Sequence, residues 1–204
     1  MALTLSKHRI EGLTDGIFAI VMTLLVLELK VPELERHATN QEIIGKLSGL
    51  GPLLFSFFLT FSLAGFFWFL HHSSMHFVRH MTRPLILLNL LFLLFVSLLP
   101  FSAAMLGRFL HAPIALEIYY GHQLVLGLLL LIHWEVVRQS GLIVDNITAA
   151  DTAAISMRLL SVPAACVPAL VAAVFRPEWA QLVFAFVIIL GRLISRRRER
   201  AAVA

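Results

Sequence analysis

Long apolar runs without charged residues alternate with short polar connections along this chain. A helix that crosses a membrane needs about 20 predominantly apolar residues. Two of the uncharged runs have 24 residues and two have 17. These four runs are Leu47–Leu70, Pro84–Gly107, Ile118–Trp134 and Leu159–Phe175. A fifth run, Trp179–Gly191, continues through Arg192 to Ile194, because an arginine near a helix end can extend its charge to the membrane surface.

The first apolar segment is shorter than the others. Only Gly16–Leu27 is free of charge, so a full crossing must include Asp15 and Glu28. With this segment, the pattern predicts an all-α fold: a polytopic bundle of six transmembrane helices. The connections are too short for an extramembrane catalytic domain. We therefore expect one six-helix transmembrane domain over residues 1–195 and a basic cytoplasmic tail over residues 196–204.

Prolines mark the expected helix boundaries. Pro84, Pro113 and Pro177 stand where a first helical turn would begin, and Pro32 closes the first helix. Four other prolines fall within or near the ends of apolar runs, where neighbouring helices can satisfy the freed backbone groups. We expect kinks at these positions, which are Pro52, Pro100, Pro163 and Pro168.

Composition and charge exclude the other classes of protein. Hydrophobic residues make up 59% of the chain and charged residues 14%, which excludes both a soluble globule and a disordered chain. The net charge is +4, but the basic residues stand at the ends of apolar segments, so no nucleic-acid partner is expected.

With the N-terminus inside, 11 Lys and Arg face the cytoplasm and 5 face the other side, which places both termini in the cytoplasm. The basic tail is expected to attract anionic lipid.

Helical spacing places a small apolar face on the first segment. At about 100° per residue, Ile20, Leu24 and Leu27 share this face with Gly16 and with one hydroxyl, that of Thr23. Asp15 points about 140° away from Ile20 by the same geometry. Spacing alone favours a packing or lipid-facing stripe, and a pore lining is the alternative.

Histidines follow the second apolar run at helical spacing. His72, His76 and His80 are four residues apart, a spacing that could present three imidazoles to a metal. No carboxylate-rich or second histidine cluster accompanies them, so we expect histidines at the headgroup level and no metal site. The single cysteine, Cys166, lies in an apolar run. Phosphate loops, nucleophile elbows and zinc-protease motifs are absent from the sequence, as is the T-V-G-Y-G filter of ordinary potassium channels, so neither an enzyme nor a cofactor is expected.

Two motifs in the first half of the chain resemble a known family. Arg9-Ile-Glu-Gly-Leu13-Thr14-Asp15 resembles the R-x-x-x-F-S-D signature of the prokaryotic relatives of transmembrane protein 175, the endosomal and lysosomal potassium channel. Phe67-Trp68-Phe69-Leu70-His71-His72 resembles the F-W-x-x-H-H of the same family. The chain departs from the signature at Leu13-Thr14, which replaces Phe-Ser.

The resemblance implies a homotetrameric, potassium-selective leak channel without a pore-loop filter, in a prokaryotic inner membrane. In that family the first helix lines the central pore, and its bulky apolar residues form the constriction. The corresponding positions are Ile20, Leu24 and Leu27, with Thr23 as the selectivity position. The resemblance also implies an intrasubunit structural network whose members are Arg9, Asp15, Trp68 and His72.

Two other functions remain open from the sequence. A proton-coupled secondary transporter could use Asp15 and the histidines of the second helix as a proton relay. A membrane metalloenzyme could be built on the histidines at 71, 72, 76 and 80.

Overall fold

The structure, a computed structural model, describes residues 6–34, 37–145 and 147–189, and its long regular elements there are all helices joined by short connections. A single bridge between Val78 and Ile143 is the one extended pairing among them. The all-α fold is therefore confirmed. The helices in chain order are α1 (Lys7–Leu24), η1 (Leu25–Glu28), α2 (Asn40–Ser48), α3 (Gly51–His76), α4 (Arg83–Ser97), α5 (Leu99–Arg108), α6 (Pro113–Gln139), α7 (Ala149–Phe175) and η2 (Pro177–Trp179).

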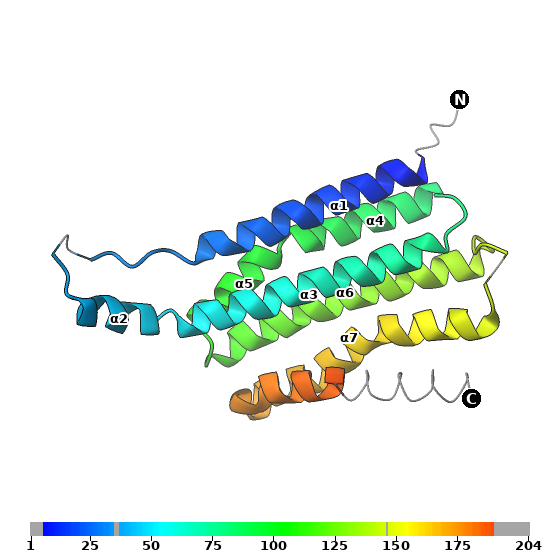
Figure 1. Cartoon of the computed structure of the whole chain (residues 1–204). Helices are drawn as coiled ribbons and strands as arrows, with labels where there is room; N and C mark the ends of the chain where they lie inside the picture. Colours follow the sequence, from blue (N-terminus) through cyan, green and yellow to red (C-terminus); the bar gives the residue numbers. More distant parts are fainter. Residues whose placement is uncertain (1–5, 35–36, 146, 190–204) are drawn as a thin grey trace, which may run out of the picture.

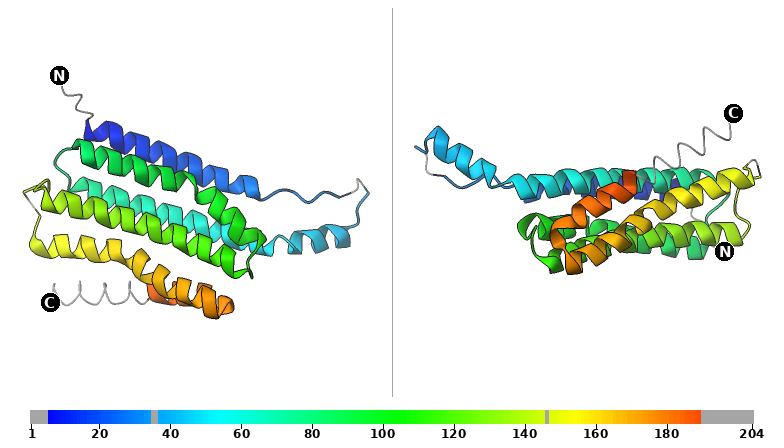
Figure 2. Two further views of the ribbon diagram at one scale, coloured as in Figure 1. Left: turned by 180° about the vertical axis from the view of Figure 1, so that it is seen from behind. Right: turned by 90° about the horizontal axis from the view of Figure 1, so that it is seen from below.

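The long helices lie side by side, with α1 next to α4, and α6 between α3 and α7 (Figure 1). Helices that follow one another as spans run in opposite directions, so α1 and α4 are parallel neighbours. We call the end where α1 begins the near end, and the end where α1 finishes at Glu28 the far end. Helix α2 projects beyond the bundle at the far end (Figure 2). The apolar helix that starts at Pro177 runs back along α7.

Five helical segments are long and apolar enough to cross a membrane, and they correspond to the first five predicted crossings. They are Lys7–Glu28, Gly51–His76, Arg83–Arg108, Pro113–Gln139 and Ala149–Phe175. The sixth predicted crossing contains a shorter apolar helix, Pro177–Ile189, and its remaining residues lie outside the described part of the chain, as does the predicted basic tail. Six crossings thus stay a prediction, whereas a multi-pass membrane protein is confirmed.

Helix α2 is an element that the apolar runs did not predict. Thr39 caps it: its hydroxyl accepts a hydrogen bond from the Glu42 amide at 3.4 Å, and its own amide donates to the Glu42 carboxylate at 2.7 Å. The Thr39 amide and the Thr39 hydroxyl both donate to the Glu42 carboxylate, and these two bonds hold the pKa of Glu42 below its ordinary value of 4.5. Helix α2 makes few contacts with the bundle, so the reciprocal hydrogen bonds between Thr39 and Glu42 are the main interactions that stabilise its first turn.

Proline positions explain where the long helices begin and bend. Pro52, Pro84 and Pro113 each stand in a first helical turn, where a missing amide proton costs nothing. The third crossing breaks at Leu98, just before Pro100, into α4 and α5. Helix α7 contains Pro163 and Pro168 and changes direction along its length (Figure 1). Of the four expected kinks, the one at Pro52 is wrong, because that proline starts a helix.

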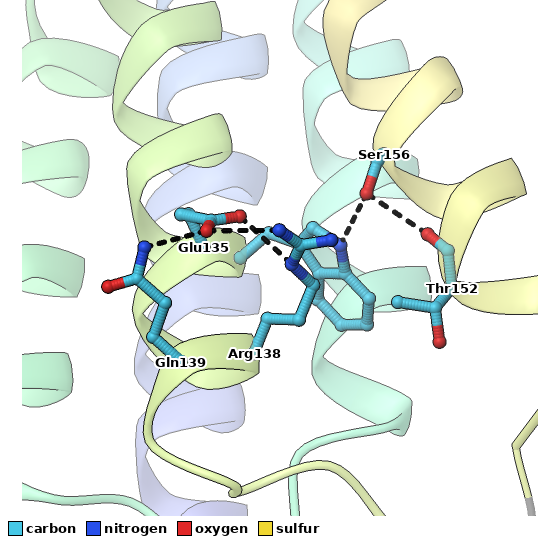
Figure 3. A network of polar contacts seen from close by, with 6 residues as sticks. Glu135, Arg138, Gln139, Thr152 and Ser156 are labelled. Atoms are coloured by element: carbon cyan, nitrogen blue, oxygen red, sulfur yellow. Dashed lines mark hydrogen bonds and ion pairs between the residues drawn. The ribbon is translucent and has the colours of Figure 1, made fainter. Parts of the chain in front are cut away.

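Gly127 of α6 allows a close approach to α7. A Cβ built on Gly127 would come within 2.7 Å of the Pro163 ring, so no larger residue fits without a shift. A polar cluster at the near end holds the same two helices (Figure 3). Trp134 donates from its indole to the Ser156 hydroxyl at 3.0 Å, and Glu135 accepts from the guanidinium of Arg138 on its own helix. The bond from Trp134 to Ser156 joins α7 to α6, whereas the Glu135–Arg138 pair lies within α6.

Candidate functional site

Helix α1 has one face packed on the bundle and one face left uncovered by the rest of the chain. The packed face consists of Ile10, Thr14, Phe18 and Val21, and Leu25 continues it into η1. The uncovered face carries the predicted constriction residues. Ile20 is 59% exposed, Leu24 41% and Leu27 65%. Only 28% of the most apolar 18-residue stretch of the first span is buried, against 50% of the corresponding stretch in α6. Among the five long spans, the first is therefore the one that the rest of the chain covers least.

Thr23 lies on the same uncovered face. Its hydroxyl donates to the backbone carbonyl of Ile20 at 2.7 Å, so its proton points into the helix. The oxygen keeps its lone pairs, which a passing cation could approach. The bond reaches the carbonyl three residues earlier, one of the local back-bonds that helical threonines make.

The far end of α1 tightens where the predicted constriction lies. The α-helix ends at Leu24, and Leu25–Glu28 form a 3₁₀ turn. The carboxylate of Glu28 accepts a hydrogen bond from the guanidinium of Arg108, with Oε2 and Nη2 2.9 Å apart. This ion pair joins the end of α1 to the end of α5.

The structure brings together three of the four residues predicted for the intrasubunit network. Trp68 donates from Nε1 to the Asp15 carboxylate at 2.8 Å. The Trp68 ring stacks on His72 with centroids 5.4 Å apart and planes 24° apart. Asp15 is exposed within the single chain. The side chain of Arg9 makes no hydrogen bond or ion pair within residues 6–34, 37–145 and 147–189.

A buried polar chain beside this contact was missed by the sequence analysis. His71 donates from Nε2 to the Asn89 side-chain oxygen at 2.7 Å, because an amide oxygen can only accept. The Asn89 amide then donates to the Thr14 hydroxyl at 3.2 Å, and Thr14 donates to the Ile10 carbonyl at 2.9 Å. This series of hydrogen bonds connects α3 and α4 to the packed face of α1. The signal that could have found it is the four-residue spacing of His71 from buried Phe67.

The histidines do not form the arrangement that a metal site needs. Helix α3 ends at His76, so His80 lies beyond it and cannot share its face with His72 and His76. No group of three potential metal ligands occurs in the part of the chain that the structure describes. The rings of His71 and His133 are neighbours, with centroids 6.0 Å apart, but His71 is already bonded to Asn89.

Comparison with known sequences relates the chain to ion channels. Residues 9–100 match the family model described as endosomal/lysosomal potassium channel TMEM175. The human protein named endosomal/lysosomal proton channel TMEM175 is 38% identical over 114 residues, which are 53% of this chain and 23% of the human one. A protein of Streptomyces collinus named as a potassium channel is 34% identical over 102 residues, 50% of this chain and 48% of that protein. The matched part of the chain thus spans about a quarter of the human relative and about half of the bacterial one.

Comparison with solved structures extends over nearly the whole chain. A lysosomal potassium-selective channel TMEM175 homolog from Chamaesiphon minutus superposes with a TM-score of 0.79 at 26% identity. The match covers 93% of this chain and 97% of that one. The relatives are named as channels, in agreement with the prediction that the chain is not an enzyme.

Proposed function

We propose that this chain, whose residues 9–100 match the model of the TMEM175 family, forms a potassium-selective leak channel whose ion path runs along the uncovered face of α1. The observation that supports this most is the contrast between the two faces of α1. One face packs on α3 and α4, while the other presents Ile20, Leu24 and Leu27 with no covering element among the described residues.

A single uncovered helix face cannot enclose a path, so the channel requires several copies of the chain. We propose a homotetramer around a central axis, with α1 of each copy innermost and no pore-loop filter. The apolar side chains then form a hydrophobic constriction that can close by dewetting. Potassium gives up its hydration water more easily than sodium, so a narrow apolar ring can favour potassium without carbonyl ligands.

The proposed location is a prokaryotic inner membrane with both termini in the cytoplasm. The near end of the bundle, which carries Lys7, Arg79, Arg83 and Arg138, would then face the cytoplasm, as the distribution of positive charge requires. The proposed channel domain covers residues 1–195. The tail over residues 196–204, for which we propose contact with anionic lipid, lies outside the described residues.

The decisive experiment is ion flux through purified protein in liposomes. Liposomes that hold a potassium gradient should lose potassium rapidly, and currents in planar bilayers should reverse close to the potassium equilibrium potential. Protein-free liposomes and protein-containing liposomes with sodium on both sides are the matched controls.

The same preparation tests proton conduction, which the name of the human relative raises. An internal pH dye should report little acidification under a proton gradient when potassium is absent. Reversal at the proton equilibrium potential would contradict potassium selectivity. Saturable flux that stops without a proton gradient would instead favour the coupled transporter.

A further inference from the structure

We propose that Arg108 is a positioning residue for the constriction: through its ion pair with Glu28 it holds the last turn of α1 in the 3₁₀ form that aligns Leu27 with Leu24. This inference rests on the proposed function, because it concerns the same path. Arg108 lies on α5, outside the helix that lines the path, and acts only through Glu28.

The 3₁₀ turn changes the direction in which Leu27 points. An α-helix rotates about 100° per residue and a 3₁₀-helix about 120°, so three residues of 3₁₀ geometry turn Leu27 by about 60° relative to a continued α-helix. In a 3₁₀ turn, side chains three residues apart eclipse one another, which places Leu27 in the same row as Leu24. The width of the path at Leu27 therefore depends on which helical form the turn adopts.

The charge of Glu28 makes this turn dependent on a partner. Glu28 stands at the last position of the helix, where the unpaired carbonyls give the helix a partial negative charge. A carboxylate there is repelled unless a cation compensates it. The guanidinium of Arg108, 2.9 Å from the carboxylate, supplies that compensation.

Arg108 is carried by a rigid support. A Cβ built on the preceding residue, Gly107, would come within 2.8 Å of the Leu53 side chain and 3.1 Å of its Cα, so α5 and α3 are in close contact there. Ser56 of α3 donates to the Ala103 carbonyl of α5 at 2.6 Å, which locks the same contact. Leu25, only 1% exposed, packs the start of the turn into the core. The turn is thus held at its start by packing and at its end by charge.

The test measures where position 27 points and how the channel conducts. A Leu27→Cys protein is labelled with a small neutral methanethiosulfonate, and the native Cys166 does not interfere because it is buried. Labelling rates and conductance are compared in backgrounds carrying Glu28→Gln, Arg108→Gln, or the exchange of Glu28→Arg with Arg108→Glu. The matched control is Arg176→Gln, which removes a far-end cation that pairs with Glu178 and not with α1.

We expect both single substitutions to slow labelling at position 27 and to change conductance, each by at least about threefold, as a modest population shift of the turn would produce. The exchanged pair should restore both towards the parent values, and Arg176→Gln should leave both unchanged. Unchanged labelling and conductance in the single variants would overturn the proposal. Changed conductance with unchanged labelling would also overturn it, because the charges would then act on the ion directly.

The labelling result separates this proposal from the proposed function. If the parent protein conducts no potassium but labelling slows and recovers as expected, the channel assignment fails and the positioning role of Arg108 stands. If the parent conducts and the labelling rates are all equal, the channel assignment stands and the positioning role fails.

Discussion

At the scale of single residues, the hydroxyl of Thr23 differs from every other group on the uncovered face of α1. Its proton is used by the Ile20 carbonyl, so the group can interact with an ion only through its oxygen lone pairs. A cation that leaves part of its hydration shell at the apolar ring would find one such oxygen in each subunit. The alternative role of this hydroxyl is the bond to its own helix alone.

Replacement of Thr23 by valine should therefore lower the potassium-to-sodium permeability ratio. Valine keeps the branched shape but removes the oxygen. Thr23→Ser, which keeps the hydroxyl, is the matched control and should retain most of the preference. Reversal potentials under opposed potassium and sodium gradients give the ratio directly, and equal ratios in the parent and the valine variant would assign the hydroxyl to its back-bond alone.

Ile20 is the residue at which wetting of the constriction should be most sensitive. Ile20→Asn introduces a side chain that holds water, so we expect cation conductance to rise and selectivity to weaken. Leu87→Asn is the control, because Leu87 of α4 is similarly exposed, at 67%, but lies on another helix. If the two variants conduct alike in bilayer recordings, Ile20 does not line the path.

At the scale of elements, the break between α4 and α5 frees backbone carbonyls inside the bundle. His122 of α6 supplies a hydrogen-bond donor there: its Nε2 donates to the Phe95 carbonyl at 2.9 Å, and its Nδ1 lies 2.8 Å from the Ser102 hydroxyl. Since a carbonyl cannot donate, Nε2 carries the proton. A side chain from a neighbouring helix thus compensates for the local disruption before Pro100.

His122→Leu should destabilise the protein, because it removes the imidazole hydrogen bonds to the Phe95 carbonyl, which keeps the Leu98 amide as a second donor, and to the Ser102 hydroxyl. The loss of a hydrogen bond typically costs about 0.5–1.5 kcal/mol, which should appear as a lower melting temperature in detergent. His111→Leu, at an exposed far-end histidine, should leave the melting temperature nearly unchanged. Equal stability of both variants would contradict the bridging role.

The contact between α1 and α3 through Asp15 should support the scaffold without setting ion preference. Trp68→Phe removes the indole donor to the carboxylate, and a hydrogen bond to a charged group typically contributes about 1.5–3 kcal/mol. We expect Trp68→Phe and Asp15→Ala to lower melting temperature or assembly yield, measured by size-exclusion chromatography. Assembled variants should keep their reversal potentials. Normal assembly with altered selectivity would place Asp15 in the ion path.

Sequence patterns predicted the elements that depend on the length of apolar runs, because a bilayer requires such runs to be nearly free of charge. Helix ends were less accessible: α6 runs from Pro113 to Gln139, well beyond its 17 uncharged residues, since helices continue past the hydrocarbon layer. Trp68 contacts Asp15 and His72, which are two members of the network that the motif resemblance implies, and the role of that network stays a prediction. The His71–Asn89–Thr14 chain was missed because its members come from three helices whose packing no single segment specifies.

At the scale of the whole molecule, the chain leaves its first helix incompletely covered. Lipid could cover such a face, but Thr23 and the small residues Gly12 and Gly16 suit close contact between helices. We expect native mass spectrometry to detect particles four times the mass of the 22.8 kDa chain. A predominantly monomeric or dimeric particle in several mild detergents would contradict a central path built from α1.

The connection after α1 has a practical consequence. Residues 29–34 form no helix, and Val31 within them is 88% exposed. Helix α1 is held instead by its packed face and by side-chain bonds along its length, which include the Lys7 ammonium donating to the Val78 carbonyl at 2.9 Å. Non-covalent contacts therefore hold the segment that carries the proposed ion path in place, and the exposed connection after it contributes little. A synthetic peptide of residues 1–34 should complement a fragment that starts at residue 37, which would allow non-natural side chains to be placed at Thr23.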